Sequence, residues 1–185
     1  GSGLTSSVCI TSTDLDILEK IQVRCALSEP PTKAKPRTSP KHKQSYRLLF
    51  SSHIARTIEA AGLQGTKAVR RLPAIPDEHF WHFLRGFMDG DGHIAARKRK
   101  DGRLSGVRLS FTCHPAFGAE LQAKIVQLAG LPEKMYNHDE AEGAAPLKTI
   151  CYYGSNAVLL ANKIYQGATI YMDRKKKVFD NYFHN

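Results

Sequence analysis

The chain has 185 residues, of which 27 are Lys or Arg and 17 are Asp or Glu, so its net charge at pH 7 is +10. A hydrophobic content of 42% is typical of a folded globular protein and excludes a disordered chain. No apolar run approaches the roughly 20 residues that a membrane helix needs, so no membrane partner is expected. The isoelectric point near 9.6 favours an acidic partner, nucleic acid first.

The cysteines indicate an intracellular protein that is not secreted. Cys9, Cys25, Cys113 and Cys151 lie far apart and form no CxxC pair, so we expect reduced thiols and neither a structural zinc site nor a disulfide framework. No signal peptide is visible. The first residues, Gly-Ser-Gly, resemble a cloning remnant, so the sequence is expected to be a fragment of a longer protein.

The first part of the chain, residues 1–72, is predicted to alternate strands and helices. Ser12 or Thr13 can cap a helix that follows, and Leu15 and Leu18 begin its apolar stripe. Prolines in the basic stretch 29–43 prevent a helix there. The predicted elements are a strand over 6–11, a helix over 14–27, a long loop or irregular hairpin over 29–43, a strand over 46–51, a helix over 53–61 and a linker over 65–76.

The second part, residues 73–185, opens with a strong helical pattern, because Phe80, Phe83, Leu84 and Phe87 recur at helical spacing. The predicted elements are helices over 78–89, 115–129, 155–166 and 173–182, and strands over 93–99, 104–112, 134–138 and 147–153. The order strand, helix, loop, strand, helix occurs in 6–72 and again in 104–178. The sequence therefore predicts an α+β protein with pseudo-two-fold symmetry, whose first copy lacks its opening helix and strand.

The sharpest motif is residues 84–92, Leu-Arg-Gly-Phe-Met-Asp-Gly-Asp-Gly, at the end of the predicted helix 78–89. Gly86 would let a second backbone approach this helix closely. Asp91 lies just past the helix end, where the helix dipole is negative, so its carboxylate is unfavourable there unless a cation joins it. Asp91 is therefore a candidate ligand for a hard divalent ion, and Gly90 offers a carbonyl oxygen. The alternative is an ordinary turn, which Asp-Gly sequences often form.

This nine-residue block closely resembles the LAGLIDADG signature of homing endonucleases. The predicted order helix, strand, strand, helix, strand, strand, helix resembles the αββαββα unit of that family. Residues 168–175, Ala-Thr-Ile-Tyr-Met-Asp-Arg-Lys, resemble the closing segment of its dodecapeptide-type members, which are often encoded within inteins.

The resemblance implies a catalytic arrangement. Two units pack through their signature helices, and Asp91 binds Mg²⁺ or another divalent cation at the centre of that interface. Lys175, and Lys67 after the first unit, would face the scissile phosphates during phosphodiester hydrolysis. However, the chain carries one signature helix where a single-chain enzyme of this family needs two. The second acid would come from upstream residues or from another chain. If neither supplies it, the protein would bind nucleic acid without cleaving it.

The resemblance also implies that an antiparallel sheet enters the major groove of double-stranded DNA. Period-two alternation places one set of side chains on the outer face of the second part's sheet, and these candidate DNA contacts are His93, Arg97, Arg99, Arg108, Ser110, Thr112, Thr149 and Tyr153. In the first part, either Tyr46 or Arg47 would face DNA. The basic stretch 29–43 would contact backbone phosphates or form a linker, and its candidate contacts are Lys33, Lys35, Arg37 and Lys43.

The leading hypothesis is thus a sequence-specific DNA endonuclease that cuts a long asymmetric site with a divalent metal. The alternative on the same scaffold is a catalytically inactive DNA- or RNA-binding protein, either a splicing maturase or a transcription regulator. A third class, a small-molecule or protein-interaction domain, predicts binding that salt does not weaken, whereas phosphate contacts predict steep weakening.

Overall fold

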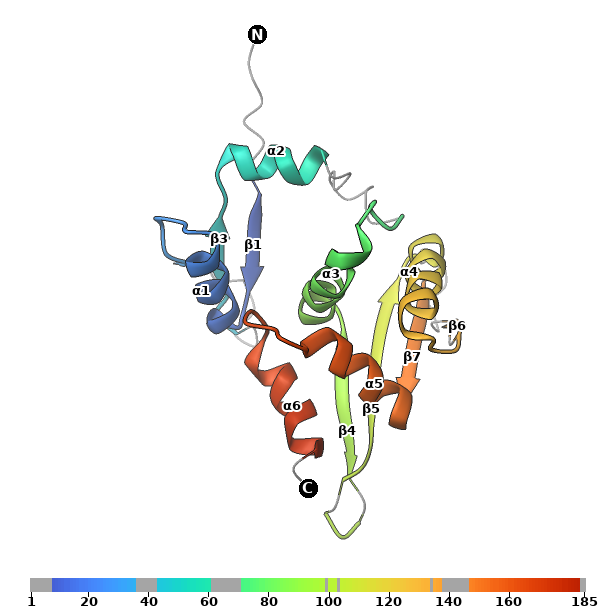
Figure 1. Cartoon of the computed structure of the whole chain (residues 1–185). Helices are drawn as coiled ribbons and strands as arrows, with labels where there is room; N and C mark the ends of the chain where they lie inside the picture. Colours follow the sequence, from blue (N-terminus) through green and yellow to red (C-terminus); the bar gives the residue numbers. More distant parts are fainter. Residues whose placement is uncertain are drawn as a thin grey trace, which may run out of the picture. The chain divides into compact units, whose positions relative to one another are not determined.

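A computed structural model describes residues 8–35, 43–60, 71–98, 100–102, 104–133, 135–137 and 147–183 (Figure 1). The chain divides into two compact units, Gly1–Gln64 and Gly65–Asn185, which we describe separately. Both units combine helices with a small antiparallel sheet, so the predicted α+β class is confirmed. In the part of the chain that the structure describes, no helix is both long enough and apolar enough to cross a bilayer.

The first unit is a three-stranded sheet with two helices. Its elements are β1 (Cys9–Ser12), α1 (Leu15–Arg24), β2 (Thr32–Lys33), β3 (Tyr46–Leu49) and α2 (Ser52–Ala60). The strand order is β1-β3-β2. The described part of the proline-rich stretch contains the short strand β2, which pairs antiparallel with β3 and places Thr32 opposite Arg47. Of the two expectations, a loop or an irregular hairpin, this part matches the hairpin. The buried apolar side chains of the first unit are Ile17, Leu18, Leu48, Phe50 and Ala55.

The second unit contains a four-stranded sheet in the order β4-β5-β7-β6. Its elements are α3 (Asp77–Gly90), β4 (His93–Lys98), β5 (Leu104–Cys113), α4 (Pro115–Ala129), β6 (Met135–Asn137), β7 (Lys148–Tyr153), α5 (Gly154–Tyr165) and α6 (Asp173–Phe183). From α3 to α5 the element order is the predicted one, and α6 follows it.

Local signals explain the ends of α4. Pro115 occupies the first turn, where its missing N–H costs no hydrogen bond. The Nδ1 atom of His114 accepts a hydrogen bond from the backbone N–H of Ala116 at 3.3 Å, which caps the helix. Gly130 ends it with a φ of +65°, a conformation that favours glycine.

The core of the second unit lies on one face of its sheet. Val107, Leu109 and Phe111 point into it from β5, as the alternation predicted, and Ile150 and Tyr152 do so from β7. Side chains of α3, α4, α5 and α6 belong to the same buried cluster, so these helices cover that face. The outer face carries the described members of the predicted DNA contacts in β4, β5 and β7, and burial of the inner face fixes their register.

The start of the second unit includes the residues just before α3. The backbone N–H of Leu72 donates to Glu120 Oε2 at 2.7 Å, and Arg71 Nε lies 2.9 Å from Glu120 Oε1. The Leu72 side chain also packs against the core of the second unit. Arg71 and Leu72 therefore pack with the second unit.

The two units share a topology. In the first, β1 pairs with β3 and β3 with β2; in the second, β5 pairs with β7 and β7 with β6. A helix follows the equivalent strands in each case: α1 and α4 after β1 and β5, α2 and α5 after β3 and β7. Residues 8–35 and 43–60 contain no counterpart of α3 or β4.

Candidate functional site

The candidate site is the tight turn at the C-terminal end of α3. The Asp91 N–H donates to Phe87 O at 3.0 Å and the Gly92 N–H to Met88 O at 3.0 Å, so the chain leaves the helix within two residues. A Cβ on Gly92 would lie 2.7 Å from the Met88 Cα, so only glycine fits there. The Asp91 side chain is exposed. The turn therefore presents its carboxylate to solvent at the negative end of the helix.

Lys175 holds this turn from α6. Its ammonium donates to the carbonyl oxygens of Met88 at 2.7 Å, Asp89 at 2.8 Å and Gly92 at 2.6 Å. The side chain is only 5% exposed. Lys175 thus places a positive charge on the negative end of α3, adds a second donor to the Met88 carbonyl and provides a donor for the carbonyls of Asp89 and Gly92.

Two further charged side chains of α3 fix the segment between α5 and α6. Arg85 donates from Nε to Ile170 O at 2.8 Å and from Nη1 to Ile164 O at 3.1 Å. The Asp89 Oδ2 atom accepts from the backbone N–H of Met172 at 3.0 Å. Burial lowers the pKa of Arg85, and the nearby Asp89 charge partly opposes this effect. These bonds anchor the start of α6, and therefore Lys175, beside the turn.

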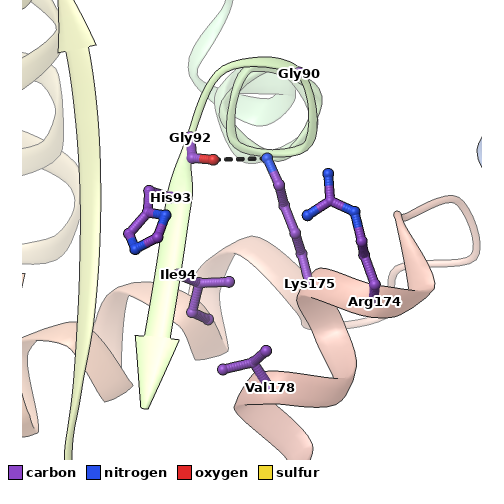
Figure 2. Close-up of a pocket in the computed structure, with 7 residues that line it drawn as sticks. All are labelled: Gly90, Gly92, His93, Ile94, Arg174, Lys175 and Val178. Carbon is purple, nitrogen blue, oxygen red and sulfur yellow. Dashed lines mark hydrogen bonds between the residues drawn. The ribbon is translucent and has the colours of Figure 1, made fainter. Parts of the chain in front are cut away.

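A small basic pocket adjoins the turn. Its volume is about 340 Å³, and Figure 2 shows the seven residues that line it: Gly90, Gly92, His93, Ile94, Arg174, Lys175 and Val178. Asp91 lies in the sequence between the two lining glycines. Burial lowers the pKa of His93, and the positive charges of Arg108 and Lys175 lower it further. The pocket combines positively charged side chains with an adjacent carboxylate, an arrangement suited to an anion and a cation bound side by side.

The residues present fit a magnesium ion in part. Magnesium is usually held by one or two carboxylates together with water and substrate phosphates. Asp91 offers one exposed carboxylate, and the Gly90 carbonyl is the other candidate ligand. Within residues 8–35, 43–60 and the described part of 71–183, no group of three or more His, Cys, Asp or Glu side chains is placed to hold a metal. A metal at Asp91 would thus need ligands from a phosphate or a second acid.

The structure places most of the predicted DNA contacts at the surface. The exposed ones in the second unit are His93, Arg97, Arg108 and Tyr153, and those in the first unit are Lys33, Lys35, Lys43 and Arg47. On the sheet, Arg108 lies between Ala95 and Tyr153. Exposed cations and an aromatic side chain therefore share one part of this face.

Other predicted contacts differ. Ser110 is only 6% exposed, so it offers little surface to a ligand. The hydroxyl groups of Thr112 and Thr149 lie 2.9 Å apart and hydrogen-bond with each other across the strands. Lys67, Arg37 and Arg99 lie outside the described residues, so their placement stays a prediction.

Gly86 lies on an exposed part of α3. No atom of the described chain lies within 4 Å of the position that a Cβ would occupy on Gly86, and the same holds for Gly90. The two glycines are four residues apart, so they lie on the same side of α3. Close approach of a second helix at Gly86 stays a prediction.

The comparisons with known proteins provide no identification, since neither a family model nor a curated protein matches this sequence. Arg85 and Asp89, which anchor the start of α6, were not among the site residues predicted from the sequence. The sequence does contain a feature that could have indicated this role. Arg85 and Asp89 are charged residues four positions apart among the apolar residues of a helix, and a charged side chain buried there needs a partner.

Proposed function

We propose that this protein is a sequence-specific DNA endonuclease that hydrolyses phosphodiester bonds with a divalent metal, magnesium in the first place. The observation that carries the proposal is the exposed Asp91 carboxylate, held at a rigid helix end beside a basic pocket. The neighbouring sheet face carries exposed Arg97 and Arg108, which suit DNA phosphates and guanine edges.

The chain's own residues supply binding and orientation. Asp91 holds the metal, with Gly90 as the further candidate ligand, and Lys175 keeps the turn in place through its three carbonyl contacts. The basic pocket attracts the phosphate group. When bound, magnesium supplies Lewis acidity toward the phosphate. The resemblance to homing endonucleases adds that Lys67 and a second signature helix, from upstream residues or another chain, complete the reaction centre.

Further support comes from the architecture. From α3 to α5 the second unit runs helix, strand, strand, helix, strand, strand, helix, and the described residues of the first unit repeat the order of its last three strands without a counterpart of α3 or β4. This order is compatible with the LAGLIDADG unit and the partial copy that the resemblance implies. The proposal includes an intracellular location, because a genomic DNA substrate is intracellular, and the same resemblance leaves an intein, an intron or a free-standing gene as the source of the chain.

The test is Asp91→Asn, with Asp101→Asn in the β4–β5 turn as the matched control. We expect Asp91→Asn to retain duplex binding in a gel-shift assay and to lose magnesium-dependent nicking of a plasmid library that carries randomised inserts. Asp101→Asn is expected to behave as the wild type. Unchanged nicking by Asp91→Asn would reject the metal role of this carboxylate.

A second candidate function is binding without cleavage, as a splicing maturase or a transcription regulator. The observations in its favour are that Asp91 provides the one exposed carboxylate of the turn 89–92, and that the described residues contain one helix of the signature type. Salt-dependent duplex binding by the wild type without nicking, in magnesium and in manganese, would favour this function over the endonuclease.

A further inference from the structure

The two adjacent cations of α6 at the candidate site differ in their surroundings. Lys175 is buried, whereas Arg174 is exposed, although both line the same pocket. Figure 2 shows both side chains extending from α6 toward the last turn of α3. The distinction matters because a cation that binds DNA must have donors that can reach a phosphate oxygen.

The hydrogen bonds of Lys175 occupy its ammonium group. A protonated lysine has three N–H donors, and three carbonyl oxygens accept from it at 2.6–2.8 Å. A contact with a phosphate would have to replace at least one of these bonds. It would also leave a buried carbonyl of the α3 end without its partner, which is unfavourable. The ammonium therefore serves the turn itself.

Arg174 has the properties that a phosphate ligand needs. Its guanidinium has five N–H donors in a planar fork that matches two phosphate oxygens at once. It lines the pocket together with Gly90 and Gly92, which flank Asp91. A phosphate held there would lie next to the carboxylate that is proposed to bind the metal.

We propose that Arg174, and not Lys175, binds a DNA backbone phosphate at this turn. The inference rests on the proposed function, since it takes a DNA phosphodiester as the ligand. It differs from the role that the family resemblance implies for Lys175. In this arrangement Lys175 stabilises the end of α3, and Arg174 provides the contact with the substrate.

The experiment measures the salt dependence of duplex binding by the full chain. The probe is a fluorescein-labelled duplex of mixed sequence, followed by anisotropy over a series of salt concentrations. Each lost phosphate contact lowers the slope of log affinity against log salt by about 0.9. We expect Arg174→Ala to lower the slope by that amount and Arg174→Lys to retain it. Lys175→Met, measured where circular dichroism shows it folded, should leave the slope unchanged.

Lys163→Ala is the matched control, because it removes one exposed cation from α5, outside the pocket, and should leave the slope unchanged. An unchanged slope in Arg174→Ala would overturn the proposal even if Lys175→Met does not fold. The proposal is also overturned if Lys175→Met lowers the slope as much as Arg174→Ala does. Failure of the proposed function has a different signature, because the wild type itself would then bind the duplex without nicking it in magnesium, whatever the slopes of the variants.

Discussion

The stability of the second unit should depend strongly on Lys175. In Lys175→Met the side chain keeps its apolar length but loses the ammonium that donates to the carbonyls of Met88, Asp89 and Gly92. Hydrogen bonds to a charged group contribute about 1.5–3 kcal/mol each, so three bonds give an upper limit of about 5–9 kcal/mol. Removing the ammonium also removes the cost of burying a charge, which offsets part of this loss.

We therefore expect Lys175→Met to lower the free energy of unfolding by about 3 kcal/mol. For a domain of this size, that corresponds to a fall in Tm of about 10 °C. The single tryptophan, Trp81, packs on the core of the second unit, so its fluorescence reports the unfolding of that unit alone. Urea unfolding followed by this signal gives the change directly.

Lys177→Met is the matched control, because Lys177 is exposed on the same helix and outside the pocket. Its free energy of unfolding should stay within about 0.5 kcal/mol of the wild-type value. Equal urea midpoints for Lys175→Met and Lys177→Met would refute the reasoning. That result would mean that the three carbonyls find equivalent partners in water when the ammonium is absent.

Other residues give independent predictions. Gly92→Ala should destabilise the second unit severely, since the new Cβ would lie 2.7 Å from both the Met88 Cα and the Met88 carbonyl oxygen. Gly86→Ala should instead raise the free energy of unfolding by about 1 kcal/mol in urea unfolding, because the site is open and alanine favours a helix. A Gly86→Ala protein that is more stable but cleaves less would indicate that a second helix packs at this position. In the native protein, a disulfide reagent at pH 8 should react with two thiols, those of the exposed Cys9 and Cys25. Cys113 and Cys151 are buried, and burial also raises the pKa of Cys113 to about 11, which keeps its thiol protonated at pH 8. Reaction of four thiols before unfolding would contradict this. In a selection on randomised DNA, Arg108→Ala should change the preferred sequence, whereas Lys35→Ala should weaken all sequences alike, and the reverse pattern would contradict these assignments.

The sequence predicted the elements well where local chemistry determines them. The predicted helix 115–129 coincides with α4, because Pro115 and Gly130 mark its ends directly. The alternation of Val107, Leu109 and Phe111 likewise predicted the inner face of β5. Short strands are harder, since the two residues of β2 form only by pairing with β3, which lies outside the proline-rich stretch.

The candidate site was predictable only in part, because its key contacts join residues that are far apart in the sequence. The motif placed Asp91 at a helix end, and the structure places it there. The partners of Lys175 were not predictable, because its three carbonyl acceptors are more than eighty residues away and belong to backbone groups that carry no side-chain signal. The low exposure of Ser110 was not predictable either, because the two-residue period assigns a side chain to a face of the sheet but does not say how deeply neighbouring atoms bury it.

The topology shared by the two units bears on where a second acid would come from. In the second unit, β4 pairs with the edge of β5 that faces away from β7, and α3 precedes β4 in the chain. The equivalent edge in the first unit belongs to β1, whose only strand partner among the described residues is β3. A helix and strand added there would restore the full unit and bring a second turn like that of Asp91. The rate at which a thiol reagent labels the exposed Cys9 on β1 would test this, because a segment paired along that edge should slow the labelling. An equal rate with and without that segment would argue against strand addition.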